Sequence, residues 1–316
     1  MPHDSEDTGR ILRTPVLLVV FNRPQTTERV FSAIRKVRPQ KLYVAADGPR
    51  ADKAGEAEKA RLTRQIATRV DWDCELKTLF RDENVGCGLG PATAISWLFE
   101  QEERGIILED DCQPSESFFW FCEEVLERYN HDSRVMQVSG MNPLGDWCHD
   151  PDYDYYFSEA GVTWGWATWR RAWRSYDYYV PSFKGMLHKG YLYNFYLNHS
   201  RTRWIMNCLD EAYCRLPTVT WWDYQWEFAK FINSGLSVVP RASLVQNIGF
   251  GEDATHTFEK IEFAAGQSSE LAFPLRHPAF VLRDAVADKR YHAMRLRTDW
   301  RKKIKKRLRD LGFGTG

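Results

Sequence analysis

The sequence predicts an α/β fold with a doubly wound, mostly parallel sheet, in the manner of a nucleotide-binding domain, followed by an aromatic-rich lobe. Two observations support this prediction. Between residues 14 and 140, short apolar runs alternate with stretches of helical periodicity, the order that builds parallel sheets. Nine of the 13 tryptophans then lie between Trp147 and Trp226. The chain therefore divides into a regular first half and an aromatic second half.

The regular half is predicted to contain five strands with helices between them. The strands are expected at residues 15–21, 41–46, 75–80, 105–108 and 135–138. The helices are expected to follow Pro24, to span residues 57–70, to begin at Pro91 after a Gly86–Gly90 turn, and to span residues 114–129.

Ligands of doubly wound sheets bind beyond the carboxyl ends of the strands. Polar residues follow three of the predicted strands, and a glycine-rich turn follows another. The segments expected to converge on one cleft are therefore Asn22-Arg23, Asp47-Gly48, Gly86–Gly90 and Glu109–Asp111.

Composition narrows the class of function and the compartment. The 316 residues include 43 basic and 43 acidic residues, so the basic excess of a nucleic-acid-binding domain is missing. The seven cysteines form no C-x-x-C pair, which favours a reducing cytoplasm over a disulfide framework. Residues 1–13 form a polar tail without a signal-peptide core, and no run reaches about 18 apolar residues. We expect a cytoplasmic protein, with association at the inner face of the membrane as an option.

Three consecutive acids, Glu109, Asp110 and Asp111, follow the apolar run that ends at Leu108. Their mutual repulsion raises the cost of ionisation unless a cation or hydrogen-bond donors compensate. A divalent metal and a ribose would supply both, because Mg²⁺ and Mn²⁺ prefer carboxylate and phosphate oxygens. The alternative is a solvated strand end whose acids face water.

Residues 106–111, together with Arg23 and Asp47, resemble the glycosyltransferase A fold. The closest resemblance is to bacterial relatives of the animal N-acetylglucosaminyltransferase that initiates hybrid and complex N-glycans, and it covers residues 15–256. It implies that Asp111 binds Mn²⁺ (or Mg²⁺) and that Asp110 contacts the ribose of a nucleotide-sugar.

The same resemblance implies roles for three further residues. Glu109 would support the nucleotide site, Arg23 would approach the diphosphate, and Asp47 would read the uracil of a uridine diphosphate sugar. On this basis residues 14–140 form a nucleotide-sugar-binding half and residues 141–260 an acceptor-binding and catalytic half. An irregular segment is expected at residues 261–283.

The aromatic half contains two candidate segments. Trp164, Gly165 and Trp166 are expected to line a sugar or acceptor pocket, because flat rings can cover the apolar face of a sugar. The alternative is a helical stripe of Trp166, Trp169 and Trp173 facing the core. The core interpretation is preferred for Trp169 and Trp173.

The second segment, Trp221 to Trp226, is similar to the family segment that carries the catalytic base, with Trp222 beside it as a pocket residue. The resemblance implies that Asp223 takes the proton of the acceptor hydroxyl during an inverting transfer. The residues alone allow an equal alternative, in which Asp223 caps the following helix. Glu227 and Asp210 are rivals for the base.

A glycine-rich polar loop ends at His256, which is expected to contact a metal ion or a phosphate, since imidazole suits Mn²⁺. The alternative is a simple surface histidine. Near the end of the chain, residues 284–316 are expected to form a basic helix. Between Lys289 and Arg309 there are eleven Lys and Arg residues and one acid. Such a helix can lie on an anionic membrane, or it can pack on its own domain.

These features together predict a metal-dependent, inverting glycosyltransferase that moves a sugar, N-acetylglucosamine being one candidate, to an oligosaccharide or lipid-linked acceptor of the bacterial surface. One alternative is a sugar-phosphate nucleotidyltransferase, although Phe21 leads directly to Asn22 without the glycine-rich loop of that class. The other is a non-catalytic carbohydrate-binding protein, which would not need three adjacent acids.

Overall fold

The computed structural model describes residues 10–214, 221–249 and 268–310, with the side chains of residue 212 and residues 298–310 left out. An eight-stranded sheet forms its centre, in the order β3-β2-β1-β4-β8-β6-β9-β7. All of these strands run in one direction except β8 and β7, which are antiparallel to their neighbours. The prediction of an α/β protein with a large, mostly parallel sheet is confirmed.

The strands of the large sheet are β1 (Val16–Val20), β2 (Lys41–Ala46), β3 (Glu75–Phe80), β4 (Arg104–Glu109), β6 (Val135–Ser139), β7 (Tyr155–Ser158), β8 (Trp166–Trp169) and β9 (Leu236–Pro240). Two short strands, β5 (Cys112–Pro114) and β10 (Val245–Asn247), pair in a second sheet. All five predicted strands are present, and the aromatic half adds three strands to the same sheet.

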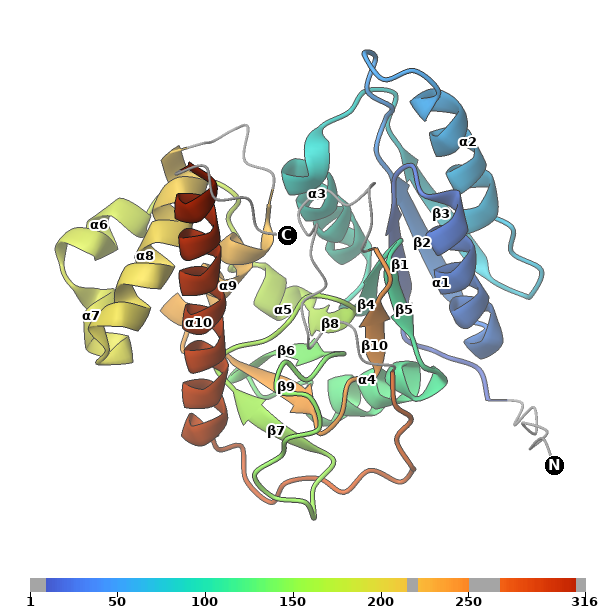
Figure 1. Cartoon of the computed structure of the whole chain (residues 1–316). Coiled ribbons are helices and arrows are strands. Elements are labelled where there is room, and N and C mark those ends of the chain that lie inside the picture. Colours follow the sequence, from blue (N-terminus) through green and yellow to red (C-terminus); the bar gives the residue numbers. More distant parts are fainter. Residues whose placement is uncertain (1–9, 215–220, 250–267, 311–316) are drawn as a thin grey trace.

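Helices cover both faces of the sheet, as Figure 1 shows. They are α1 (Pro24–Val37), α2 (Glu56–Ala67), α3 (Gly86–Gln101), α4 (Glu116–Arg128), α5 (Arg170–Trp173), α6 (Phe183–His188), α7 (Tyr191–Tyr196), α8 (His199–Cys214), α9 (Asp223–Ile232) and α10 (Ala285–Asp310).

Side-chain alternation along β1 explains the two layers. Val16 and Leu18 belong to the core beneath α1 and α4, whereas Leu17 belongs to the core beneath α3 and α9. Because β1 is hydrophobic on both faces, it is stable only with helices on both sides.

Two local predictions were wrong. The expected turn at residues 86–90 is the first turn of α3, which begins at Gly86 and contains Pro91. The alternative of a helical stripe is also wrong in its geometry, because Trp166 and Trp169 lie on β8, although Trp169 and Trp173 are buried in the core as preferred. Three residues apart on a strand, Trp166 and Trp169 face opposite sides of the sheet, and each is buried in a different core.

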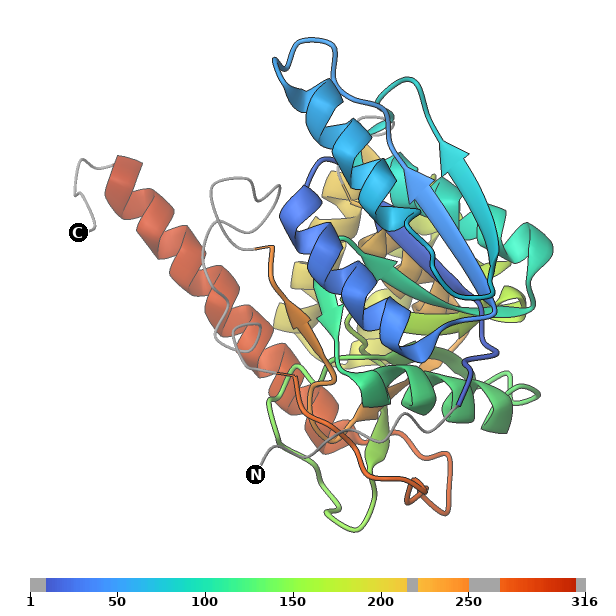
Figure 2. The same ribbon diagram turned by 90° about the vertical axis from the view of Figure 1, so that its right-hand side faces the viewer.

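Helix α10 confirms the predicted C-terminal helix and is tied to the body near its start. Asp288 is buried and pairs with Arg283, while the Ser158 hydroxyl donates to its carboxylate. His292 lies 3.1 Å from the Glu159 carboxylate, which also pairs with Arg283. Figure 2 shows α10 extending from this anchored end away from the sheet.

Candidate active site

The carboxyl ends of β1, β2 and β4 meet at one edge of the sheet. β1 pairs with both other strands, so that Val20 lies opposite Ala46 and Val19 lies opposite Glu109. The chain segments that follow these strands therefore leave the sheet from adjacent positions. They carry Arg23, Asp47 and the acidic triplet.

Arg23 is brought directly onto the triplet. Its Nη1 lies 2.8 Å from Asp111 Oδ2 and 3.4 Å from Asp110 Oδ1. The backbone N–H of Phe21 donates to Asp110 Oδ2 at 3.1 Å. Arg23 also stands at the start of α1, where the positive end of the helix dipole adds to its charge.

One guanidinium does not balance three carboxyl groups. Burial, followed by the charges of Asp111 and Asp110, raises the pKa of Glu109 from 4.5 to about 8. Burial likewise raises the pKa of Asp110 from 3.8 to about 7, although Arg23 acts in the opposite direction. A further cation bound here would favour the ionised form of both acids.

Asp111 is the more accessible of the two acids that contact Arg23. Its side chain is 17% exposed, against 9% for Asp110. Its hard carboxylate oxygens fit Mn²⁺ or Mg²⁺, which take phosphates and water as further ligands. Within the described residues, no three His, Cys, Asp or Glu side chains are grouped so as to hold a metal ion by themselves.

Asp47 anchors the start of α3. Its carboxylate accepts the backbone N–H groups of Gly48, Val85 and Gly86 at 2.9–3.1 Å. These bonds occupy N–H groups that a helix start leaves unpaired, which explains why the helix begins before Pro91. The structure therefore gives Asp47 an architectural task, and its predicted contact with uracil stays a prediction.

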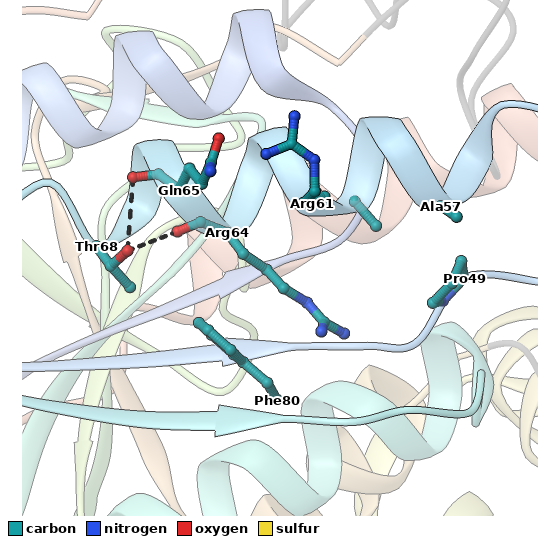
Figure 3. Close-up of a pocket in the computed structure, with 8 residues that line it drawn as sticks. Pro49, Ala57, Arg61, Arg64, Gln65, Thr68 and Phe80 are labelled. Atoms are coloured by element: carbon teal, nitrogen blue, oxygen red, sulfur yellow. Dashed lines mark hydrogen bonds between the residues drawn. The ribbon is translucent and has the colours of Figure 1, made fainter.

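Arg64 of α2 is a supporting residue that the sequence reasoning missed. One of its Nη atoms donates to the carbonyl of Asp47 at 3.1 Å and to that of Arg81 at 2.5 Å, tying the ends of β2 and β3 together. Its guanidinium lies 5.0 Å from the ring centre of Phe80. Figure 3 shows Arg64 beside Phe80 among the residues that line a cavity of about 270 Å³. Because α2 carries many charged residues, its sequence does not indicate that Arg64, rather than another arginine, contacts the sheet.

Glu56 is a second missed residue, at the start of α2. It is buried and accepts hydrogen bonds from Asn22 Nδ2 at 2.9 Å and from the backbone N–H of Arg50 at 2.7 Å. It also pairs with the Arg50 guanidinium, which lowers the pKa of Glu56. Glu56 thereby fixes the segments that follow β1 and β2. Its role becomes visible only in the structure, where a buried acid is unusual.

The segment after β10 closes over Asp111. The N–H of Ile248 donates to the Asp111 carbonyl at 2.7 Å, continuing the pairing of β10 with β5. Gly249 follows immediately, and a Cβ at this position would lie 2.2 Å from Asp111 Oδ2. Only glycine fits this approach without a shift of the carboxylate. His256, the other predicted metal contact, lies outside the described residues.

Asp223 is the first residue of α9, after the N-cap residue Trp222. Its charge contributes to the raised pKa of Glu109, so carboxyl groups from α9 and β4 are neighbours although they are far apart in the sequence. An acid in the first turn also suits the helix dipole. Of the two rivals, Asp210 is exposed on α8, and Glu227 lies one turn further along α9.

Glu227, whose side chain is partly exposed, pairs with a buried network that secures α9. Lys230, which is almost fully buried, lies 2.8 Å from Glu227 and donates to Ser237 Oγ at 2.9 Å. The Gln137 carboxamide accepts the indole N–H of Trp226 at 3.0 Å. Its amide donates to the carbonyl of Val162 at 3.0 Å, so the network reaches the segment before Trp164.

The four predicted pocket residues divide into two pairs. Trp166 and Trp222 are buried and stacked on each other, with ring centres 5.6 Å apart, in the aromatic core beneath α9. Neither offers a face for a sugar in this structure. Trp164 is only partly buried, and Gly165 has a φ of +64° with Val245 and Leu108 filling the space of a side chain. The contact of any of the four with a ligand stays a prediction.

No described helix has both the length and the apolar character required to cross a bilayer. No protein-family model and no curated protein sequence matches the chain. Among solved structures, the chain is similar to HddC from Yersinia pseudotuberculosis, with 11% identity, a TM-score of 0.32, and coverage of 52% of this chain and 80% of that chain. It is also similar to a UDP-glucose pyrophosphorylase complexed with UDP-glucose, with 7% identity, a TM-score of 0.30, and coverage of 52% and 78%. Likeness at this level carries no argument about function.

Proposed function

We propose that this chain is an inverting, metal-dependent glycosyltransferase that uses a uridine diphosphate sugar. The observation that carries the proposal is the contact of Arg23 with the acidic triplet at one edge of a mostly parallel sheet, where the charge of Asp223 also raises the pKa of Glu109. This edge is where such sheets bind their ligands. Arg23, beside Asp110 and Asp111, would provide a contact for an anionic group of the donor. Asp223 would provide the base.

Each residue has a defined task in this proposal. Asp111 would hold Mn²⁺ or Mg²⁺ together with the donor phosphates, and the ion would supply positive charge for the leaving diphosphate. Arg23 would bind the diphosphate, and Asp110 and Glu109 would bind the ribose side of the nucleotide. Asp47 would contact the uracil.

Asp223 would accept the proton of the attacking acceptor hydroxyl. Its place at the start of α9, where its charge acts on Glu109, would put a carboxylate beside the proposed donor site. Trp164 and Gly165 would border the sugar, while Trp166 and Trp222 would support that border from the core. The acceptor would be an oligosaccharide or a lipid-linked glycan of the bacterial surface.

Calorimetry with uridine diphosphate, with and without Mn²⁺, tests the donor site directly. We expect binding that is at least tenfold tighter with the metal. A panel of uridine diphosphate sugars, including the N-acetylglucosamine derivative, then tests metal-dependent release of uridine diphosphate. Preference for uridine triphosphate plus a sugar phosphate would favour a nucleotidyltransferase, and no nucleotide binding at all would favour a carbohydrate-binding protein.

The basic end of α10 is proposed to bind an anionic membrane and so bring the site to a lipid-linked acceptor. The helix is anchored near Asp288, and its last turns carry most of the basic residues of this region. Each cation near such a surface adds about 1 kcal/mol, less at high salt. Reversing the charges of Lys302, Lys303, Lys305 and Lys306 should reduce sedimentation with anionic vesicles. Unchanged sedimentation would reject this role.

A further inference from the structure

Helices α6 and α7 form a hairpin at the outer edge of the molecule, beyond α8 (Figure 1). The inner side of this hairpin is part of a small core, in which Phe183 and Leu192 are buried against Leu209 of α8 and Phe228 of α9. The hairpin is therefore held firmly, and its other side is turned outward. We call the exposed residues of this hairpin the α6–α7 face, and they are Lys184, Lys189, Tyr191, Tyr193 and Leu197.

The α6–α7 face presents large apolar side chains to solvent. Tyr191 is 49% exposed, Tyr193 is 40% exposed and Leu197 is 74% exposed. Tyr193 is steadied by stacking on His199, with ring centres 4.3 Å apart. Leu197 has a φ of +49°, a left-handed conformation that is unfavourable for leucine. A strained, exposed leucine at a helix end suggests a contact surface rather than a packing position.

The charge on this part of the chain has one sign. No Asp or Glu occurs between Tyr178 and Leu209, although acids and bases are balanced in the whole chain. Lys184 and Lys189 of the hairpin are exposed, although the ammonium of Lys184 also lies 4.6 Å from the ring centre of Tyr213 on α8, and Arg203 is exposed on α8 itself. None of these three cations pairs with a carboxylate in the described part of the chain, whereas Arg201 is buried against Glu159.

Exposed tyrosines, a protruding leucine and lysines that pair with none of the described carboxylates match the requirements of a membrane interface. Tyrosine rings favour the headgroup region, aliphatic side chains enter the acyl boundary, and lysines attract anionic lipids. A protein partner fits less well, because lysine is depleted in protein interfaces. We propose that the α6–α7 face docks on an anionic lipid bilayer. This goes beyond sugar transfer and beyond the basic end of α10, since it assigns lipid contact to a different element.

Co-sedimentation of the full chain with vesicles tests the proposal without donor or acceptor, so its outcome is separate from that of the transferase assignment. Vesicles of pure phosphatidylcholine are compared with vesicles containing 30% phosphatidylglycerol, at low and high salt. Leu197→Gly removes the protruding side chain and suits the positive φ, so the fold should be kept. It should weaken partition on the order of tenfold.

The double change Lys184→Glu and Lys189→Glu should weaken partition into the anionic vesicles by about 25-fold or more, at about fivefold for each lost cation. Two control variants make changes of the same kind outside the α6–α7 face. Phe280→Ser removes another protruding side chain, 78% exposed, and Lys53→Glu with Lys59→Glu reverses two exposed charges next to or within α2. Both controls should bind vesicles like the unmodified chain.

Three outcomes would overturn the proposal. The unmodified chain could fail to sediment with anionic vesicles at low salt. The α6–α7 variants could sediment as well as the controls, which would leave any lipid binding to α10. Size-exclusion chromatography could show an oligomer that Leu197→Gly dissociates, which would make the face a contact between two copies of the chain.

Discussion

The backbone of Gly249 lies directly against the carboxylate of Asp111, so closely that a methyl group on Gly249 would come within 2.2 Å of Asp111 Oδ2. Gly249 follows β10 and Asp111 follows β4, and the two segments are held together by the pairing of β10 with β5 and by the hydrogen bond from Ile248 to the Asp111 carbonyl. The position of the proposed metal ligand therefore depends on a glycine from the other half of the chain.

Gly249→Ala is expected to displace the Asp111 carboxylate and to weaken metal-dependent binding of uridine diphosphate at least tenfold. Gly185→Ala is the matched control, because a Cβ at Gly185 meets no atom within 4 Å. Calorimetry with Mn²⁺ measures both variants. Equal affinity of the two would mean that the Asp111 side chain can move aside without consequence.

Asp111→Ala is expected to abolish the effect of Mn²⁺ on nucleotide binding while the protein stays folded. Arg23 would keep its contact with Asp110, so the cluster would retain an ion pair. Calorimetry, with circular dichroism as the check on folding, provides the measurement. Affinity equal to that of the unmodified chain would end the assignment of Asp111 to the metal.

Asp223→Asn is expected to leave donor binding nearly unchanged and to lower turnover by about a hundredfold to ten-thousandfold, the usual effect of removing a general base. Asp210→Asn, a change of the same kind at an exposed position on α8, should have little effect. If Asp223→Asn turns over normally, Glu227 becomes the candidate base, since it lies one turn away on α9.

Lys230→Met is expected to destabilise the fold by about 2–4 kcal/mol, because it leaves the partly exposed Glu227 and the buried Ser237 without their common partner. The second change, Glu227→Gln, should recover part of this loss, since it removes the unpaired charge. Urea unfolding of the two single variants and the double variant measures the coupling. Simple additivity of the two effects would show that the pair does not act as a unit.

The raised pKa values of Glu109 and Asp110 predict a pH dependence of stability in the absence of metal. The folded state holds these protons above the ordinary values of 4.5 and 3.8 and loses them near about 8 and about 7. Their stabilising contribution is therefore complete at low pH and is lost as the pH rises through this window.

We accordingly expect the metal-free chain to be more stable at pH 5 than at pH 8, and Mg²⁺ to stabilise it more at pH 8 than at pH 5. Glu109→Gln should reduce the difference between the two pH values. Urea unfolding with EDTA or with Mg²⁺ measures the effect. An identical pH dependence in Glu109→Gln and in the unmodified chain would contradict the assignment to this residue.

The sequence by itself determined the regular half of the fold and the place of the acidic triplet. Apolar runs bounded by turns are local signals, so the five strands were predicted within a few residues, and Glu109–Asp111 was correctly expected at a strand end. Parallel pairing then requires that the ends of neighbouring strands share one edge, which predicted the meeting of Arg23 with the triplet.

Tertiary structure decided what depends on contacts between distant segments. Trp166 and Trp169 have helical spacing, but pairing of β8 with β4 and β6 makes them strand residues on opposite faces. The start of α3 depends on Asp47, the approach of Gly249 to Asp111 depends on β10, and the closeness of Asp223 to Glu109 depends on how α9 packs. Such contacts leave no periodic trace in the sequence, because each is set by the folded sheet rather than by neighbouring residues.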